Sequence, residues 1–455
     1  MDGWRMEPAF PGRRTRKGAL REMSRRGTRR RSAGRSDSPS RGVREKHPSQ
    51  AGRELHEEGA SANRVLSGKP QLSRRINASL ILGLIRREGR LSRADLVRLT
   101  GLRATSVSDI VDQLLEHNLL REVGPGRSTG GRPPVMLEIN PRGLCAAGFE
   151  ITPAEVRAVL VDFSGNAAAR LSYSLESPEP ERVVDTIAGV LRDIRRRAGG
   201  LARKLAGLGV AIPGIINKDE ARVVFSRPLG WKNVDIKALL VRRLKIDVRV
   251  MNNAVAGALA ANYDCNSGEA NSLLFFLIYL QGAPRSEAAT VGCGIVLDDR
   301  AYLGDGHMAG EIGVTVTHPL TLAQKYGVSR GLRDMRDLVA ASRAEPHRFA
   351  RLWSAFAREL GGLVARGVDF LNPGLVVIGT DTPELEMLAG DRIRQVLQEQ
   401  SAAGRIAAGL KENTELWAPR VRFMLMECDT LARGAIVPHL QELSLLPLLR
   451  EGVFM

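Results

Sequence analysis

Three short helices followed by a β-hairpin are predicted between residues 80 and 139, and this pattern constrains the fold more than any other feature of the chain. The evidence is a series of apolar side chains at helical spacing, in stripes separated by short turns. The expected stripes are Leu80, Leu84 and Ile85; Leu96, Val97 and Leu99; and Val107, Ile110, Val111 and Leu114. Ser92, followed three residues later by Asp95, has the form of a capping box, and Gly101 is expected to end the second helix.

Two strand-like runs, Leu119–Val123 and Met136–Ile139, follow on either side of a glycine-rich segment at residues 124–134. Three helices and a hairpin in this order predict a winged helix-turn-helix, whose third helix enters the major groove of DNA. The hairpin is then the wing, and its residues Arg127 and Arg132 suit a minor groove lined by phosphates.

The outward positions of the third helix and the wing supply the predicted DNA contacts. These residues are Arg103, Thr105, Ser106, Ser108, Asp109, Arg127 and Arg132. The hydroxyl groups would reach base edges or phosphates, and the arginines would contact the DNA backbone and the minor groove. Small three-helix units also bind proteins, but the basic wing favours double-stranded DNA. Asp109 and Asp112 leave two interpretations: acceptors for cytosine amino groups, or solvated side chains.

Most of the positive charge lies in an N-terminal tail. The chain has 455 residues and a net charge of +17, of which residues 1–75 contribute +12. This tail is rich in Arg, Ser and Gly and poor in apolar residues, so we expect it to be disordered. Its run Arg25–Arg31 is suited to nonspecific phosphate contacts. In the alternative interpretation the true start is Met6 or Met23, and part of this tail is an artefact without function.

The composition argues against a secreted or membrane-bound protein. The sequence has no hydrophobic signal-peptide core and no apolar run of membrane-spanning length, since Leu273–Leu280 is short and reads as a buried strand. The four cysteines and seven histidines are scattered without metal-ligand spacing, so free thiols and no structural metal are expected. We therefore expect a cytoplasmic protein, associated with the nucleoid when bound to DNA, that contacts no membrane.

Beyond the wing, strands and helices alternate in two rounds. The first has a hairpin, Ala146–Ile151 and Val156–Phe163, and a helix near residues 180–197. The second begins with Leu273–Leu280 and Thr290–Leu297 and has a long helix, Phe349–Leu371. Two such rounds predict a duplicated α/β body with a ligand cleft between its lobes. The expected domains are residues 1–75 (tail), 76–141 (winged helix-turn-helix), 142–255 (lobe 1) and 256–445 (lobe 2).

Five motifs in order carry a family resemblance. They are Gly209–Gly214 (GVAIPG), Leu229–Val234 (LGWKNV), Asn252–Ala254 (NNA), Gly292–Val296 (GCGIV) and Ala309–Gly313 (AGEIG). With the preceding DNA-binding unit, the chain resembles the ROK family of repressors and sugar kinases. The resemblance implies two actin-like, ribonuclease-H-type lobes, with a C-terminal helix near Leu431–Leu440 returning across the lobes. It also implies a homodimer or homotetramer that binds a two-fold operator.

Departures from the family's kinase members imply that catalysis is lost. Asn253 stands where those members have the Asp that takes the proton from the sugar hydroxyl, and an amide cannot act as this base. Glu150–Glu155 (EITPAE) replaces the first phosphate loop, where a proline and two carboxylates would disfavour ATP. Val314 replaces the family's zinc-binding His, and Gly379–Asp381 (GTD) replaces the adenosine-side Gly-Gly. We expect no catalytic residue, no cofactor and no metal, the alternative being an active kinase with an accessory DNA-binding domain.

The resemblance also places a ligand site in the cleft. Glu311 corresponds to the carboxylate that grips sugar hydroxyls, and Asn252 and Asn253 are suited to bind a polyol. Trp231 has two interpretations, stacking on a sugar face or packing inside a lobe. The expected function is a DNA-binding regulator, most simply a repressor, whose operator affinity is changed by a sugar-like effector. The alternative is a DNA-binding protein that senses no ligand.

Overall fold

A computed structural model describes residues 70–126, 133–217, 222–265, 270–281, 286–402 and 419–443. The chain divides into residues 1–68 and 69–455, and all described residues lie in the second part. Most of the predicted tail, the wing tip with Arg127 and Arg132, and the N-terminal run Arg25–Arg31 therefore lie outside the described residues. Residues 70–75, which we had assigned to the tail, are the start of a helix.

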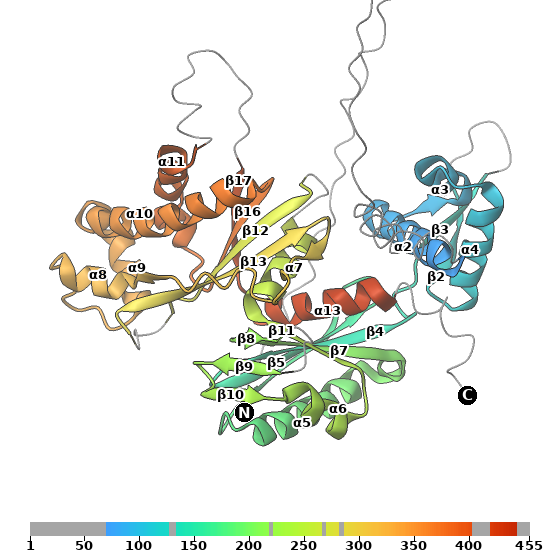
Figure 1. The fold of residues 1–455 in the computed structure, drawn as a ribbon, viewed down its shortest axis with the longest axis horizontal. Coiled ribbons are helices and arrows are strands. Elements are labelled where there is room, and N and C mark those ends of the chain that lie inside the picture. The colour runs from blue at the N-terminus through green and yellow to red at the C-terminus, as the bar shows by residue number, and fades with distance from the viewer. Residues whose placement is uncertain are drawn as a thin grey trace, which may run out of the picture. The chain divides into compact units, whose positions relative to one another are not determined.

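The first described unit consists of three helices and a three-stranded sheet (Figure 1). Its elements are α2 (Pro70–Glu88), β1 (Leu91–Ser92), α3 (Arg93–Thr100), α4 (Ala104–Glu116), β2 (Leu120–Pro125) and β3 (Val135–Ile139). Strand β3 lies in the middle and pairs antiparallel with both β1 and β2. The two-residue strand β1 was not predicted, because so short a run has no recognisable period.

The cap predictions for α3 are confirmed. The Ser92 hydroxyl accepts a hydrogen bond from the Asp95 amide, and the Asp95 carboxylate accepts one from the Ser92 amide at 3.1 Å. Both hydrogen bonds satisfy amide groups that a helix start leaves unpaired. At the other end, Gly101 adopts φ 68° and ψ 7°, a left-handed conformation that glycine enters without a steric cost.

The predicted stripes are confirmed for α4 and partly wrong for α2 and α3. Leu80 is 44% exposed and Leu99 is 49% exposed. In α2 the buried stripe is Ala78, Ile81, Leu82 and Ile85. This stripe follows i, i+3, i+4, i+7, which places Leu80 off the buried face. Helix α3 has only two turns, and Leu99 lies in its last one, outside the narrow buried face.

Lobe 1 is built on a five-stranded sheet of order β11-β7-β4-β5-β6. The strands are β4 (Cys145–Ile151), β5 (Glu155–Asp162), β6 (Ala167–Ser174), β7 (Leu205–Ile212) and β11 (Val248–Asn252). The first three form an antiparallel meander, and β7 and β11 join β4 in parallel. Helices α5 (Pro180–Ala198) and α6 (Ile236–Leu244) cover one face (Figure 1).

A small antiparallel sheet adjoins lobe 1 and settles the role of Trp231. Its strands are β8 (Ile215–Ile216), β9 (Val223–Ser226) and β10 (Trp231–Val234). The Trp231 side chain belongs to the lobe 1 core with 3% exposure, and its indole N–H donates to the Pro178 carbonyl at 2.6 Å. The packing interpretation is confirmed, and stacking on a sugar is wrong.

Lobe 2 repeats the strand order of lobe 1. Its sheet runs β14-β13-β12-β16-β17, with β15 (Thr315–Thr317) paired to β13. The strands are β12 (Ser272–Ile278), β13 (Ala288–Leu297), β14 (Arg300–Ala301), β16 (Leu375–Thr380) and β17 (Arg420–Leu425). Again the first three are antiparallel and the last two join β12 in parallel. The duplication predicted from the sequence is therefore present in the topology.

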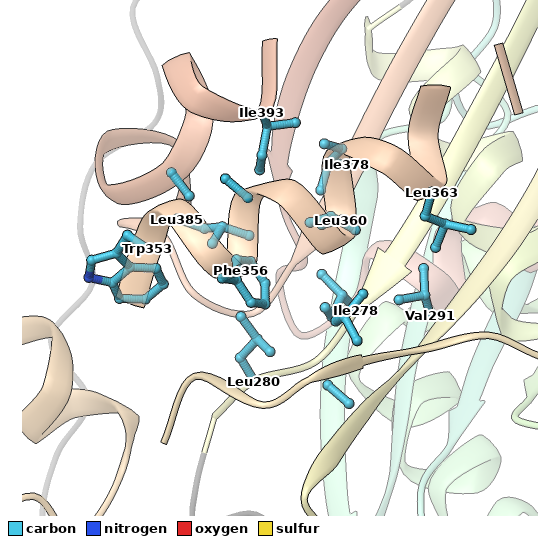
Figure 2. Packing of buried hydrophobic residues seen from close by; sticks show 14 of the residues in the cluster. Ile278, Leu280, Val291, Trp353, Phe356, Leu360, Leu363, Ile378, Leu385 and Ile393 are labelled. Carbon is cyan, nitrogen blue, oxygen red and sulfur yellow. The ribbon is translucent and has the colours of Figure 1, made fainter. Parts of the chain in front are cut away.

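The outer face of the lobe 2 sheet carries a large helical layer. It consists of α8 (Pro319–Lys325), α9 (Met335–Ala344), α10 (Pro346–Leu371) and α11 (Asp391–Gln400). Figure 2 shows Phe356, Leu360 and Leu363 of α10 near Ile278, Leu280 and Val291 of the strand segments. Alternate β12 residues, Leu273, Phe275 and Leu277, belong to a different core on the opposite face, as the two-residue period of a strand requires.

Two central helices each pack on the sheet of the lobe that they do not follow in sequence. Helix α7 (Asn253–Cys265) follows the last strand of lobe 1 but packs on the lobe 2 sheet, whereas α13 (Thr430–Leu443) follows the last strand of lobe 2 and packs on β4 and β7 of lobe 1. Glycines permit the close approach: a Cβ at Gly148 or Gly209 would overlap α13 backbone carbonyls, and one at Gly434 would overlap the Ala256 carbonyl of α7. The predicted return of the C-terminal helix is confirmed.

Candidate functional site

The residues of α4 that were predicted to contact DNA lie outside its buried face. Val107, Ile110, Val111 and Leu114 are buried. Arg103, Thr105 and Asp109 are exposed, and Ser106 and Ser108 are half-buried. Arg103 lies just before the first turn of α4 and makes no capping hydrogen bond with its side chain, which leaves its guanidinium accessible. The structure thus groups five of the seven predicted contacts on one helix, and Arg127 and Arg132 lie outside the described residues.

Ion pairs that the sequence did not reveal hold this face in place. Arg93 of α3 donates to the Asp112 carboxylate of α4 at 2.6 Å and to the Ser108 carbonyl at 3.3 Å. Asp112 therefore has an internal partner, and neither interpretation offered for it, cytosine acceptor or merely solvated side chain, describes it fully. Because Arg93 and Asp112 stand 19 residues apart on different helices, spacing alone gave no reason to pair them.

A second ion-pair group ties the hairpin to the start of α3. Glu138 of β3 accepts hydrogen bonds from Arg90 at 2.8 Å and from Arg121 at 2.7 Å. Burial acts to raise the pKa of Glu138, but the two guanidinium groups outweigh it and the net shift is downward. The carboxylate therefore stays ionised, and the base of the hairpin is fixed from both neighbouring strands.

Two of the predicted ligand-binding residues, Asn252 and Glu311, lie in contact. The Asn252 side-chain amide donates to the Glu311 carboxylate at 3.1 Å and to the Gly214 carbonyl at 2.8 Å, and its oxygen accepts from the Ala254 amide at 2.6 Å. Asn252 ends β11, and Gly214 follows β7, its parallel neighbour. This edge, outside the carboxyl ends of parallel strands, is where ligands bind in open α/β sheets. Glu311 comes from lobe 2, so the pair joins the lobes.

Glu311 has no cationic partner among the residues that the structure describes. Although part of the residue is exposed, burial of the carboxylate raises its pKa. No cation among the described residues forms an ion pair with it, and the buried Cys293 thiol nearby has its pKa raised to about 12 by burial, with a contribution from Glu311. Asn253, the first residue of α7, is half-buried and has no side-chain hydrogen bond within the described part of the chain. Such a carboxylate, beside an amide, suits a ligand that donates hydroxyl hydrogen bonds.

The carboxyl ends of β4 and β16 carry charged groups that are held by partners within the chain. The Asp381 carboxylate, just after β16, accepts from the Leu280 amide at 2.8 Å and the Gln281 amide at 3.0 Å, at the end of β12. At the end of β4, Glu150 is 3% exposed, pairs with Arg157 at 3.4 Å and accepts from the Tyr279 hydroxyl of lobe 2. Burial raises the pKa of Glu150.

Glu150 and Glu155 share a cation that the sequence spacing did not reveal. Arg157 lies between the two carboxylates and pairs with both. One guanidinium offsets one of the two negative charges, so the repulsion of ATP expected from the sequence is weaker than two bare carboxylates would give. An ion pair also lies at the end of β4, and the Asp381 carboxylate accepts from the backbone amides that follow β12.

Thiols and metal ligands in the described residues give no further site. Cys145, Cys265, Cys293 and Cys428 are free thiols, as predicted. No group of three or more His, Cys, Asp or Glu side chains that could hold a metal ion occurs within the described ranges. No helix in the same ranges is long and apolar enough to cross a membrane.

Two lobes with one shared strand order and exchanged central helices define an actin-like α/β protein of the sugar-kinase type. The protein carries a ROK family domain, which matches residues 146–329. The matched range contains the Asn252–Glu311 pair and all five sequence motifs.

The relatives are named as repressors. The chain is 28% identical over 240 residues to the xylose repressor of Bacillus spizizenii, covering 53% of this chain and 60% of that protein. It is 25% identical over 368 residues to a putative xylose repressor of Caldicellulosiruptor sp., covering 73% of this chain and 90% of the relative. A solved ROK family transcriptional regulator, a homologue of the E. coli MLC protein, superposes with a TM-score of 0.64 at 19% identity, covering 82% and 98% of the two chains. That likeness confirms the fold.

Proposed function

We propose that this protein is a DNA-binding transcriptional repressor whose operator affinity is set by a sugar bound between its lobes. The observation that carries the proposal is the Asn252–Glu311 contact, a polar site open to hydroxyl donors, in a chain whose α4 presents an exposed polar face. The described helices and sheet 70–126 and 133–139 have the element order of a winged helix-turn-helix, and relatives named xylose repressor agree with this assignment. D-xylose is the first effector to test.

A two-part experiment tests the function directly. The full chain selects DNA from a random-sequence pool, and the enriched fragment is footprinted with and without D-xylose and a panel of other sugars and sugar phosphates. We expect a two-fold site, as a homodimer or homotetramer requires, and a sugar that both raises Tm and changes the footprint. Binding to DNA without sequence preference, or no sugar that raises Tm, contradicts the proposal.

The same cleft supports the proposal that no kinase activity remains. Asn253 has no basic oxygen to accept a proton from a sugar hydroxyl, and the Asp381 carboxylate holds amide groups that a phosphate would otherwise need. We expect no sugar-dependent ATP consumption across the same panel. Measurable turnover that Asn253→Ala removes would instead establish an active kinase with an accessory DNA-binding unit.

The raised pKa of Glu311 predicts a pH-dependent effector affinity. Only the ionised carboxylate accepts hydrogen bonds through both oxygens, so affinity should be full above this raised pKa and fall as the pH is lowered through it. Glu311→Gln should weaken sugar binding about 30-fold, as expected for the loss of hydrogen bonds to a charged group, and should flatten the pH profile. Calorimetry from pH 5 to pH 8 measures both effects.

Glu181→Gln, on the exposed start of α5, is the control and should leave affinity and pH profile unchanged. Because Cys293 has a pKa near 12, its thiol does not titrate in this range. A Glu311→Gln profile with the same slope as that of the unmodified protein would show that another group titrates and that Glu311 does not contact the sugar.

A further inference from the structure

Helix α7 connects the sugar site to a contact with the first helical unit. Its first residues lie at the cleft, where Asn252 holds the Ala254 amide. Its last turn carries Tyr263, whose hydroxyl donates to the Ser164 carbonyl at 3.0 Å. A 13-residue helix spans about 20 Å. One rigid element therefore reaches from the cleft to the turn that joins β5 and β6.

That turn receives a half-buried arginine from α2. Arg86 donates from its guanidinium to the Phe163 carbonyl at 3.1 Å and lies over the Phe163 ring, 5.3 Å from its centroid. Phe163 has 0% exposure and belongs to the same apolar core as Ile81, Leu82 and Ile85 of α2. Burial lowers the pKa of Arg86, and Tyr263 is near enough to act on it in the opposite direction. The contact is specific, because one guanidinium meets both the carbonyl and the ring of a single residue.

Helix α7 is packed so tightly that a shift of its first turn should move the whole helix and should not be taken up by rearranged side chains. Residues Ala254 to Ala261 are all buried. A Cβ at Gly294 of β13 would overlap the Ala254 carbonyl, and one at Gly434 of α13 would overlap the Ala256 carbonyl. Backbone packed on backbone leaves no side-chain rotamers to adjust, and close-packed interiors pass strain on to their neighbours. At the far end, Arg433 of α13 pairs with Asp264 at 2.9 Å, which holds the two helices together.

We propose that α7 is the mechanical link between the sugar site and the DNA-binding unit, and that Tyr263 and Arg86 are the positioning residues through which its displacement reaches α2. The link rests on the proposed function, since it explains how sugar binding would change the affinity for DNA. Neither residue touches DNA or sugar in this scheme. Each sets how strongly one binding event changes the other, a coupling that typically amounts to a 5–150-fold change in affinity.

The test measures that coupling in the full chain. DNA affinity is determined with and without saturating D-xylose, or with the panel sugar of largest thermal shift if D-xylose gives none, using the fragment selected from the random pool. Tyr263→Phe removes only the hydroxyl that meets Ser164. We expect it to keep the separate DNA and sugar affinities within about twofold and to reduce the sugar-induced change in DNA affinity at least threefold, within the range that coupling mutations show. Arg86→Lys, which cannot make the same planar contact, should act in the same direction.

Matched controls lie close by. Tyr302→Phe removes a hydroxyl from another exposed tyrosine, and Arg87→Lys changes the neighbouring, exposed arginine of α2, so both should leave the coupling intact. If sugar changes the DNA affinity of the Tyr263→Phe and Arg86→Lys proteins as strongly as it does in these controls, the link is wrong while the proposed function stands. If they weaken DNA binding equally with and without sugar, their role is only structural and the link is again wrong. If the unmodified protein shows no coupling with any sugar, the proposed function itself fails, and the link with it.

Discussion

Gly434→Ala is expected to destabilise the protein by about 3–5 kcal/mol, although the same change in an exposed helix is stabilising by about 1 kcal/mol. The added Cβ would overlap the Ala256 carbonyl, and the obstacle is backbone that cannot rotate away. Relief requires that α13 and α7 move apart, which would also open the contacts of α13 with β4 and β7. Urea denaturation followed by circular dichroism measures the loss.

Gly83→Ala provides the matched control for this prediction. Gly83 is an exposed helical glycine of α2, and nothing lies within 4 Å of the position of an added Cβ. The two variants make one chemical change in two helices, and helix propensity alone predicts the same sign for both. Opposite signs would establish that the α7–α13 contact decides the outcome. If Gly434→Ala is as stable as Gly83→Ala, the two helices do not pack this closely in solution.

Ser106→Glu is expected to weaken DNA binding about a hundredfold, or ~2.7 kcal/mol. Ser106 lies in the first turn of α4, the part of a recognition helix that meets base edges. A longer, negatively charged side chain there would meet the bases and phosphates at close range. The same substitution favours folding, because α4 has no acidic residue in its first turn and a carboxylate there interacts well with the helix dipole. Loss of DNA binding would therefore not reflect unfolding.

Fluorescence anisotropy with the selected DNA fragment measures this effect, and Ser174→Glu serves as the control. Ser174 is exposed on β6 of lobe 1, so the variant carries the same added charge away from α4. A control that loses as much affinity would point to a general effect of net charge on a basic protein. A Ser106→Glu variant that binds as tightly as the unmodified chain would show that α4 does not read DNA.

The sequence predicts helices and strands correctly where a single spacing of apolar side chains dominates the segment. The stripe of α4, the cap of α3 and the strands that begin each lobe follow from residue spacing within one segment, and the structure confirms them. Strand β6 was missed because AAARLSYS is an edge strand, mostly exposed or half-buried, without a buried alternation to detect. Leu80 was misplaced because two overlapping apolar spacings were present in α2 and only the tertiary core selects between them.

The sequence identified residues of the candidate site but did not predict the contacts between them. Family motifs placed Asn252 and Glu311 near one cleft, yet 59 residues separate them and no periodicity predicts their hydrogen bond. The same holds for Arg86 and Phe163, 77 residues apart, and for Arg157 between Glu150 and Glu155. Charge compensation depends on which strands lie side by side, and this information appears only once the chain is folded.

The exchange of α7 and α13 between the lobes has a consequence for how the chain folds as it leaves the ribosome. Lobe 1 has all five strands of its sheet once residue 252 has been made, but the face of β4 and β7 stays uncovered until α13, residues 430–443, emerges. Domains usually fold as units during synthesis, the N-terminal one first. Lobe 1 cannot follow that order, since its last structural piece is translated only after all the strands of lobe 2. A nascent chain of this protein should hold an exposed apolar sheet face while about 180 further residues are made, which makes its yield depend on chaperones more than its finished stability suggests.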